Sequence, residues 1–271
     1  MYSFEQLKVF VTVCESGSFS AAARKLKRAQ SGVSQSIANL EIAIDQQKYF
    51  DQKVESLTQE DEHELIIAVD ESIIDKNFIK IISSLADQFP ITHFDIITTS
   101  TFDVEDLVRR GKALIGIIYA DGELKVDMDF FLLGQARFLT VSSATHELSQ
   151  MSVVQDSDLK RYRQCVHRSS KQRELWFTYG ISSMLWYANN HKTIIDLVEQ
   201  NVGWANVPEM MVMEGIQKGE LVALPVSHEH GGWITPVGCL VSRSHINGPV
   251  LTSLLEKLKG HSLENNQWQA N

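Results

Sequence analysis

Residues 18–45 read SFSAAARKLKRAQSGVSQSIANLEIAID, and their spacing predicts two short helices joined by a tight turn. The first helix begins at Ser18 or Ser20 and buries small alanines, which allow a second helix to approach closely. The second helix runs from about residue 31 to residue 45 and leaves a polar face away from its apolar stripe. That apolar stripe consists of Val33, Ile37, Leu40 and Ile44.

Another helix is predicted before these two. Ser3 is its expected N-cap, with Gln6 three residues later in a capping box, and Gly17 is expected to end it. Its apolar residues at helical spacing are Leu7, Phe10, Val11 and Cys14. Three short helices in this arrangement, with a tight turn between the last two, predict a helix-turn-helix unit.

Two kinds of side chain suit this unit to DNA. A basic cluster at residues 24–28 precedes the third helix, and hydroxyl and amide side chains cover the free face of that helix. Such groups bond to phosphate oxygens and to base edges in the major groove. The residues predicted to contact DNA are Ser20, Arg24, Lys25, Arg28, Gln30, Ser31, Ser34, Gln35 and Asn39. The alternative is an ordinary bundle of three amphipathic helices, which requires neither the basic cluster nor the uncharged polar face.

A dense pattern in the first 41 residues resembles one known family. The pattern comprises Leu7, Phe10, Gly17-Ser18-Phe19, Ala22-Ala23, Leu26, Gln30-Ser31, Val33-Ser34, Ile37 and Leu40-Glu41. It resembles the N-terminal domain of LysR-type transcriptional regulators. The resemblance implies a transcriptional regulator that binds double-stranded DNA as a homodimer or homotetramer and has a small-molecule effector and RNA polymerase as partners. Gln35 and Asn39 stand where family members often carry basic residues, so the DNA sequence preference is expected to differ.

Charge is distributed unevenly along the 271 residues. The net charge is -9, yet the first 50 residues hold six Lys and Arg against four Asp and Glu, which concentrates basic charge where DNA would be met. No apolar run is long enough to span a membrane, and Glu5, Gln6 and Lys8 interrupt any signal-peptide core. A cytoplasmic protein without a membrane partner is therefore expected. The three cysteines are widely separated, which argues against a disulfide framework.

From Glu64 onward the pattern changes to alternating strands and helices, which predicts an α/β domain. Helices are predicted from an N-cap at Ser72, from an N-cap at Ser100 with Asp103 in a capping box, over 193–200, and over 250–258. Strands are predicted at 65–69, 94–98, 113–119, 137–141, 164–167, 204–207 and 237–242. This alternation predicts two parallel-type sheets with helices on both faces.

The family resemblance extends over this second region. It implies two Rossmann-like subdomains of periplasmic-binding-protein type, joined by crossover strands near 137–142 and 236–241, with an effector between them. The expected domains are 1–47 for the helix-turn-helix, 48–63 for a remnant of a linker or dimerisation helix, 64–262 for the effector-binding domain, and 263–271 for a tail. Subdomain I is expected to comprise 64–140 and 237–262, and subdomain II 141–236.

Two corners of the predicted sheet offer polar groups at helix N-termini, where ligands of open α/β sheets bind. Glu71-Ser72 follows the first strand, and residues 98–101 follow the second. The resemblance places the effector there, with expected contacts Ser72, Thr99, Ser100, Thr101, Tyr119, His167, Trp204 and Pro208. The alternative is that the hydroxyl groups only cap helices. Asp70 and Glu71 at the mouth argue against a purely anionic ligand, so the effector is left unidentified.

Motifs of catalysis are not found in the sequence. It has no nucleophile elbow, no glycine-rich phosphate loop and no paired-histidine zinc motif. His228-Glu229-His230 beside two glycines is more typical of a solvated loop than of a metal site. No catalytic residue, metal or cofactor is therefore expected. A second class stays open, a cytoplasmic small-molecule sensor that does not bind DNA, but it would leave residues 18–45 unexplained.

The connection between the two regions is short. Eighteen residues separate Asp45 from Glu64, and eighteen helical residues span about 27 Å, too little for both the two-stranded wing and the long linker helix of the family. A unit of winged-helix type with its wing absent is therefore expected, followed by the tail of a linker helix at 48–59. Either the wing and most of the linker are deleted, or the sequence lacks an internal segment. The resemblance of both flanking regions to the family favours the second explanation.

Overall fold

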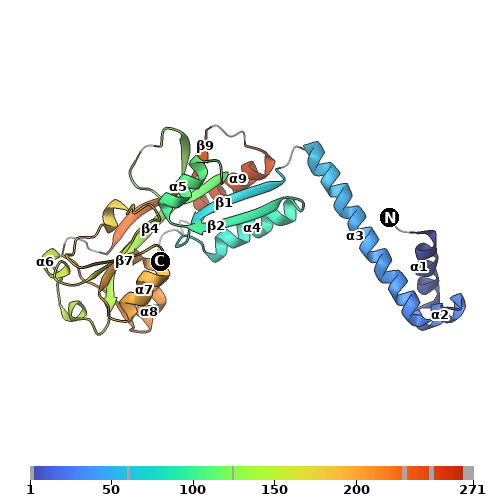
Figure 1. Ribbon diagram of the computed structural model, residues 1–271, viewed down its shortest axis with the longest axis horizontal. Coiled ribbons are helices and arrows are strands. Elements are labelled where there is room, and N and C mark those ends of the chain that lie inside the picture. The colour runs from blue at the N-terminus through green and yellow to red at the C-terminus, as the bar shows by residue number, and fades with distance from the viewer. Residues whose placement is uncertain (1–2, 60–61, 124, 228–230, 244–246, 265–271) are drawn as a thin grey trace. The chain divides into compact units, whose positions relative to one another are not determined.

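The computed structural model describes residues 3–59, 62–123, 125–227, 231–243 and 247–264 (Figure 1). The chain forms two compact units, Met1–Asp61 and Glu62–Asn271, each with its own hydrophobic core. The histidines at 228 and 230, which were considered as metal ligands, lie outside the described residues, as do residues 265–271 of the expected tail.

The N-terminal unit consists of three helices, α1 (Phe4–Ser16), α2 (Phe19–Leu26) and α3 (Gln30–Gln59). Ser3 caps α1 through the predicted capping box, and Gly17 ends the helix in the left-handed conformation with φ 67°. Ser18 is the N-cap of α2. The predicted start and end of α1 and the predicted start of α2 are therefore confirmed. Its small core is built from Val9, Ala22, Ala23 and Val33.

The buried face of α1 differs from the predicted stripe. Val9 and Thr12 are buried, whereas the predicted residues Leu7, Phe10, Val11 and Cys14 are all exposed. The reason is that apolar residues occur on both sides of this helix, so helical spacing alone fits two faces. The small side chains of α2 admit the side that carries Val9.

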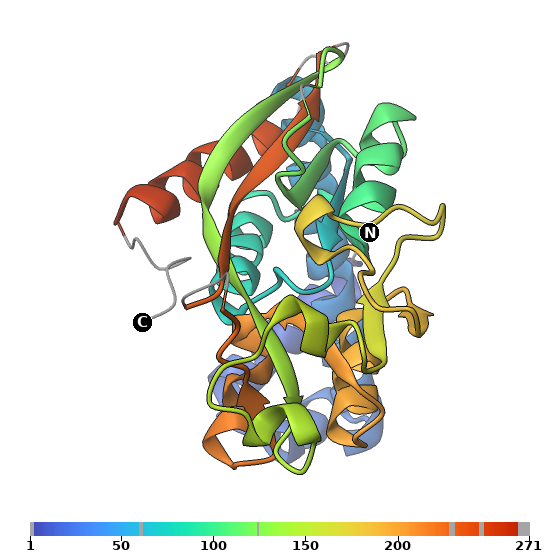
Figure 2. The ribbon, with the colours of Figure 1, turned by 90° about the vertical axis from the view of Figure 1, so that its left-hand side faces the viewer.

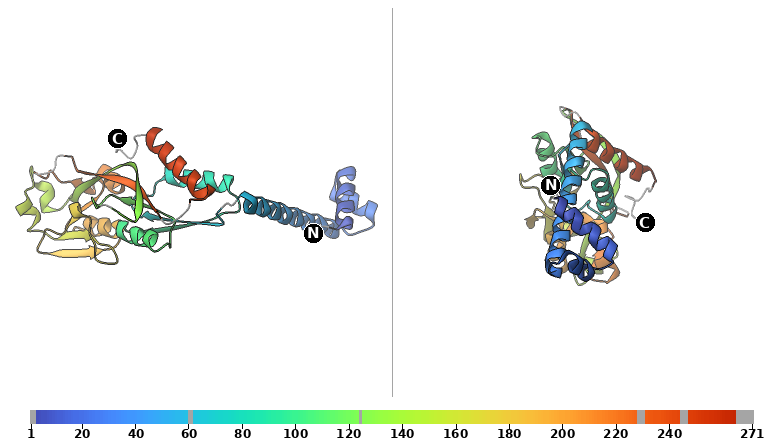
Figure 3. Two further views of the ribbon diagram at one scale, coloured as in Figure 1. Left: turned by 90° about the horizontal axis from the view of Figure 1, so that it is seen from above. Right: turned by 90° about the vertical axis from the view of Figure 1, so that its right-hand side faces the viewer.

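Helix α3 continues without interruption from Gln30 to Gln59, as Figure 3 shows. The two helical segments predicted at 31–45 and 48–59 are therefore parts of one helix. Because that helix occupies the whole stretch in which a wing would lie, the expectation of a helix-turn-helix without its wing is confirmed.

The second unit is built on one mixed sheet of nine strands. Their order is β2-β1-β3-β9-β4-β7-β5-β6, with β8 beside β4. The strands are β1 (Glu64–Asp70), β2 (His93–Thr99), β3 (Ile115–Tyr119), β4 (Met128–Ser143), β5 (Gln164–His167), β6 (Leu185–Ala188), β7 (Trp204–Pro208), β8 (Leu221–Ala223) and β9 (Trp233–Ser242). β1 pairs in parallel with β2 and β3, and β5 pairs in parallel with β6 and β7.

Two long strands join these parallel sets. β4 and β9 run antiparallel, from Met128 opposite Ser242 to Phe138 opposite Trp233 (Figure 2). At Phe138 the pairing of β4 passes to β7, where Pro208 is its partner. The prediction of two separate sheets was therefore wrong, because the crossover strands hydrogen-bond to each other and to both parallel sets. The predicted crossover segments lie within β4 and β9.

Helices cover both faces of the sheet, as predicted (Figure 1). They are α4 (Lys76–Gln88), α5 (Thr101–Arg109), α6 (Asp156–Leu159), α7 (His191–Glu199), α8 (Glu209–Gln217) and α9 (Pro249–Glu264), with short 3-10 turns η1 (Glu147–Gln150) and η2 (Trp176–Thr178). α4 and α9 share one core with β1 and β3, and α5 contributes Phe102 to that core and Val104 and Val108 to another. None of the described helices is both long and apolar enough to cross a membrane.

The predicted caps of the first two helices of this unit have different outcomes. Ser100 caps α5 and bonds to Asp103, as expected. α4, however, begins after Asp75, whose carboxylate accepts from the Phe78 backbone N–H at 2.7 Å. The prediction of an N-cap at Ser72 was therefore wrong, because the Ser72 hydroxyl donates to a buried carboxylate instead.

Candidate functional site

The nine residues predicted to contact DNA all lie on the surface of the N-terminal unit. Exposed are Ser20, Arg24, Lys25, Arg28, Gln30, Ser31, Ser34, Gln35 and Asn39. The turn between α2 and α3 contains Lys27, which adopts the left-handed conformation with φ 53° and ends α2. The unit thus forms a tight turn without glycine and leaves the polar side of α3 exposed to a ligand.

Two of the basic side chains have acidic neighbours in the same unit. Lys25 lies 2.8 Å from Glu15, and Arg28 lies 3.4 Å from Glu5. Within the described residues Arg24 forms no ion pair. Because exposed ion pairs contribute little and exchange readily, phosphate groups can replace these carboxylates.

The polar face of α3 is organised by side-chain hydrogen bonds. Gln35 donates to Asn39 at 3.0 Å, one helical turn further along α3. Ser20 donates to Gln30 at 3.1 Å and so connects α2 to the start of α3. These bonds orient amide groups on the surface while leaving their remaining donors and acceptors for base edges.

The corner at the N-terminus of α5 is filled by the chain's own Asp70. Oδ2 of Asp70 accepts from the backbone N–H and the hydroxyl of Thr101, both at 2.7 Å. Oδ1 accepts from the backbone N–H and the hydroxyl of Ser72, at 3.1 and 2.7 Å. Asp70 is 1% exposed. An internal carboxylate therefore takes the donors that the sequence analysis assigned to an effector.

Tyr119 completes this buried network. Its hydroxyl lies 2.8 Å from the Ser72 hydroxyl, and its backbone N–H donates to the Thr101 hydroxyl at 3.2 Å. Burial raises the pKa of Tyr119 well above its usual value, and burial followed by the charge of Glu71 raises the pKa of Asp70. The arrangement supports the alternative that these hydroxyl groups serve the fold, because an effector would have to displace Asp70 to reach them.

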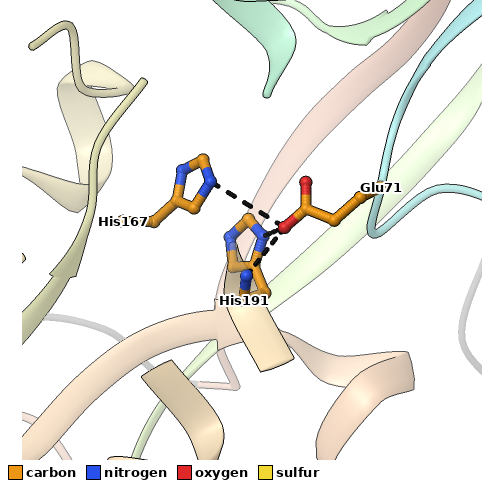
Figure 4. A group of neighbouring side chains, drawn as sticks. All are labelled: Glu71, His167 and His191. Atoms are coloured by element: carbon orange, nitrogen blue, oxygen red, sulfur yellow. Dashed lines mark hydrogen bonds and ion pairs between the residues drawn. The ribbon is translucent and has the colours of Figure 1, made fainter. Parts of the chain in front are cut away.

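Beside this corner, Glu71 reaches from the β1–α4 turn to two histidines of subdomain II (Figure 4). Its Oε1 accepts from the His191 backbone N–H at 2.7 Å and lies 2.9 Å from Nδ1 of the same residue. Nε2 of His167 lies 3.8 Å from that oxygen. The two imidazole rings stack at 4.1 Å with an angle of 8°. One possible metal-ligand atom from each residue lies within 4.8 Å of the others.

The protonation of this cluster follows from its burial. Burial and the neighbouring His191 lower the pKa of His167 to about 4, so its ring is neutral near pH 7. Burial alone would raise the pKa of Glu71, but hydrogen bonds and charge from the histidines hold it below its usual value. Among the described residues, neither Oε2 of Glu71 nor Nε2 of His167 finds a hydrogen-bond partner, although both atoms are buried. Buried polar atoms without a partner are uncommon in folded proteins.

The remaining residues predicted for the effector lie elsewhere in the domain. Trp204 is 1% exposed and donates from Nε1 to the Leu159 carbonyl at 2.9 Å. Pro208 is buried on β7, and the Thr99 carbonyl accepts from the Glu71 backbone N–H at 3.0 Å. The structure therefore brings together Ser72, Thr101 and Tyr119, places His167 in the neighbouring cluster, and leaves Thr99, Ser100 and Pro208 in structural roles.

An aromatic pocket of about 480 Å³ opens on subdomain II. Phe177 stacks on Trp233 at 5.8 Å, and Trp176 meets Trp233 edge-on at 4.8 Å. At its polar side Thr140 donates to Asn206 at 2.7 Å. Trp204 also lines this pocket, so one predicted effector residue is part of it.

The Phe138 ring contacts one aromatic side chain from each of these three parts of the domain. Its ring lies 5.0 Å from that of Tyr119 at the filled corner and 5.1 Å from that of Phe177 at the pocket. It also lies 6.1 Å from the His191 ring of the cluster.

Sequence reasoning missed most of the pocket and one member of the cluster. The aromatic run from Trp176 to Tyr179 lies in a segment without helix or strand periodicity, and an aromatic run in a loop was a usable signal. His191 offered no signal, because its partner Glu71 is 120 positions away in the chain.

The helix-turn-helix unit and the two-subdomain domain together define a class, the effector-responsive DNA-binding regulators. Residues 4–47 match the family of bacterial regulatory helix-turn-helix proteins, lysR family, and residues 58–262 match the LysR substrate binding domain. The chain therefore belongs to the LysR family of transcriptional regulators, with a helix-turn-helix DNA-binding domain and an effector-binding domain.

Named relatives and a solved structure agree with this family. The HTH-type transcriptional regulator AceR of Acinetobacter baumannii is 28% identical over 255 residues, covering 82% of this chain and 84% of that protein. The multiple virulence factor regulator MvfR of Pseudomonas aeruginosa is 27% identical over 270 residues, covering 88% and 80%. The crystal structure of HinK from Pseudomonas aeruginosa shares the fold, with a TM-score of 0.59 at 15% identity over 97% of this chain and 99% of HinK. The alternative of a sensor that does not bind DNA gains no support from these matches.

Proposed function

We propose that the regulator reads its operator with the polar face of α3. Ser34, Gln35 and Asn39 contact base edges, while the basic residues at 24–28 contact phosphates. The observation that carries this proposal is the exposure of all nine predicted residues on one small unit. A homodimer then binds a pseudo-palindromic site, because two copies of the unit match two half-sites.

A binding experiment on the full-length protein tests this reading of DNA. Sites selected from random duplexes are measured by fluorescence anisotropy at several salt concentrations. Gln35→Ala should relax discrimination at one base pair by about 1–3 kcal/mol. Gln46→Ala, an exposed glutamine later on the same helix, is the matched control and should change nothing. Absence of DNA affinity at low salt would overturn the proposal.

We propose further that the effector is a small molecule with an apolar, ring-bearing body and that it binds the aromatic pocket. Two observations support this site over the predicted corner. Asp70 already occupies the donors of Ser72 and Thr101, whereas the walls of the pocket offer aromatic faces. The Thr140–Asn206 pair supplies hydrogen-bonding groups that fix the orientation of a bound ring.

Thermal unfolding with a panel of two-ring and three-ring aromatic compounds tests the pocket. A bound compound should raise the melting temperature with the logarithm of its concentration. Trp233→Ala and Trp176→Ala should remove the shift. Trp186→Ala, which removes a comparably exposed tryptophan on β6, should retain it. A shift that survives both pocket variants would exclude this site.

We also propose the assembly and surroundings of the regulator. It acts in the cytoplasm as a homodimer, with a homotetramer as the alternative, contacts RNA polymerase at its promoters, and has no catalytic residue or organic cofactor. Light scattering of the full-length protein distinguishes dimer from tetramer. Transcription in vitro with purified RNA polymerase tests the contact with that enzyme. A monomer at micromolar concentration would contradict the proposed assembly.

A further inference from the structure

The cluster of Glu71, His167 and His191 has the composition of a metal-ligand set. Two imidazoles and one carboxylate are ligands of Zn²⁺, which takes three protein ligands and one further group in open sites. The three ligand atoms already lie within 4.8 Å of one another. We propose that this cluster binds a divalent transition-metal ion of the Zn²⁺ type, which links subdomain I to subdomain II.

The first argument is the orientation of His167. Its ring forms a hydrogen bond with the Asn189 backbone, and Nε2 has no partner, so Nδ1 carries the proton. Nε2 therefore presents a lone pair to Oε1 of Glu71 at 3.8 Å. Proteins fix the ring orientation and the tautomer of a metal-binding histidine by a hydrogen bond from its other ring nitrogen. Two lone pairs facing each other repel, whereas a cation between them is attracted to both.

The second argument is distance. Zn²⁺ lies about 2.0 Å from nitrogen and oxygen ligands, so two ligands of a tetrahedral site are separated by about 3.3 Å. Nε2 of His167 and Oε1 of Glu71 lie 3.8 Å apart, close to this span. The third ligand comes from His191, and no two of the three ligand atoms are more than 4.8 Å apart.

The third argument is burial together with unused polar capacity. The His167 side chain is 9% exposed, and Oε2 of Glu71 is also buried without a hydrogen-bond partner among the described residues. A bound metal ion would give both Nε2 of His167 and the Glu71 carboxylate a partner. Sequence spacing predicted no metal here, because the ligands come from the β1–α4 turn, the end of β5 and the start of α7.

The stacking of the two imidazole rings restricts how they can coordinate a metal ion. Lone pairs lie in the plane of an imidazole, and two planes inclined by 8° do not direct them to one point. One ring must therefore turn out of the stack when the ion binds. Coordination through Nδ1 of His191 also moves the proton of that nitrogen to Nε2. Metal binding should consequently change the NMR signals of both histidines.

The test uses the full-length protein after chelator treatment and desalting. Zn²⁺ is titrated by calorimetry, and Co²⁺ by its visible absorption. One ion per chain is expected, with a raised melting temperature. His167→Asn and Glu71→Gln should each weaken metal binding by more than about tenfold. A loss of about tenfold is what removal of an outer-shell contact alone costs. His146→Asn is the matched control, because His146 is another buried histidine of subdomain II outside the cluster.

Two further variants separate competing sites. The double variant His228→Asn with His230→Asn removes the two other histidines that the sequence analysis considered as metal ligands. Loss of binding in that variant alone, unchanged binding in His167→Asn, or no stoichiometric binding by the unaltered protein would each overturn the proposal. If Glu71→Gln fails to fold, His167→Asn decides, because Nε2 of His167 makes no hydrogen bond within the described fold.

Discussion

The DNA-reading unit and the effector domain treat their predicted functional residues in opposite ways. In the unit of α1–α3 all nine predicted residues are exposed, and the bonds among them are replaceable. In the effector domain Ser72, Thr101 and Tyr119 are buried and already bonded to Asp70 or to one another. The difference teaches that a polar residue at a helix N-terminus is a ligand site only if the chain supplies no partner of its own.

The largest effect is expected from removing that internal partner. Asp70→Ala leaves the Thr101 and Ser72 N–H groups buried without an acceptor and should lower the free energy of unfolding by about 3 kcal/mol. Denaturant titration of the full-length protein measures it. Asp95→Ala, an exposed aspartate on the neighbouring strand β2, should have almost no effect. Equal stability of the Asp70 variant would show that the corner is not closed by this carboxylate.

A charge reversal tests the exposed residues of the DNA-binding unit. Arg24→Glu should weaken binding by about tenfold or more at 0.1 M salt on every DNA sequence, because a phosphate contact is replaced by repulsion. The slope of log affinity against log salt should fall by about one. Lys112→Glu carries the same charge change on an exposed residue of the effector domain and should leave DNA affinity nearly unchanged. A loss confined to one DNA sequence would instead assign Arg24 to a base.

A substitution in the aromatic pocket should lower the free energy of unfolding less than Asp70→Ala does, because the Thr140–Asn206 pair is less buried than Asp70. Thr140→Val removes the hydroxyl that donates to Asn206 and should cost about 1 kcal/mol of stability. Thr252→Val, at an exposed position of α9, provides the comparison. A destabilisation as large as that of the Asp70 variant would mean that this pair belongs to the core of the fold rather than to a binding surface.

The smallest effect is expected for the chemical labelling of the cysteine thiols. Burial raises the pKa of Cys165 to about 11 and that of Cys239 to about 12, so neither forms a thiolate near neutral pH. Cys14 is exposed. A maleimide reagent at pH 7.5 should therefore label one thiol per folded chain and all three in denaturant, as counted by mass spectrometry. Rapid labelling of Cys165 in the folded protein would show that subdomain II opens readily.

Much of the fold could be predicted from the sequence because its signals are local. Ser3 with Gln6, and Ser100 with Asp103, are capping pairs three residues apart, and both are present in the structure. Strand positions followed from short apolar runs. The face of α1 could not be predicted, because both sides of that helix are apolar and the choice depends on Ala22 and Ala23 of another helix.

The DNA-binding surface likewise follows from local sequence signals, whereas the effector region depends on contacts between residues far apart in the chain. Exposure of the α3 polar face follows from the periodicity of one helix. The roles of Ser72 and Thr101, however, depend on a shared partner, and Thr101 lies 31 positions from Asp70. Glu71 and His191 lie 120 positions apart, so no spacing rule joins them. Joining the parallel strand sets into one sheet likewise depends on the pairing of β4 with β9, which are far apart in the chain.

Phe138 is an aromatic contact shared by three parts of the effector domain. Its ring packs edge-on against Tyr119, Phe177 and His191. Phe177 lines the pocket proposed for the effector, and His191 belongs to the cluster proposed for the metal ion. If both sites bind as proposed, thermodynamic reciprocity requires that any effect of the metal on effector affinity equals the effect of the effector on metal affinity. Phe138, the residue at which β4 pairs with both β9 and β7, is the side chain whose substitution would test such a coupling.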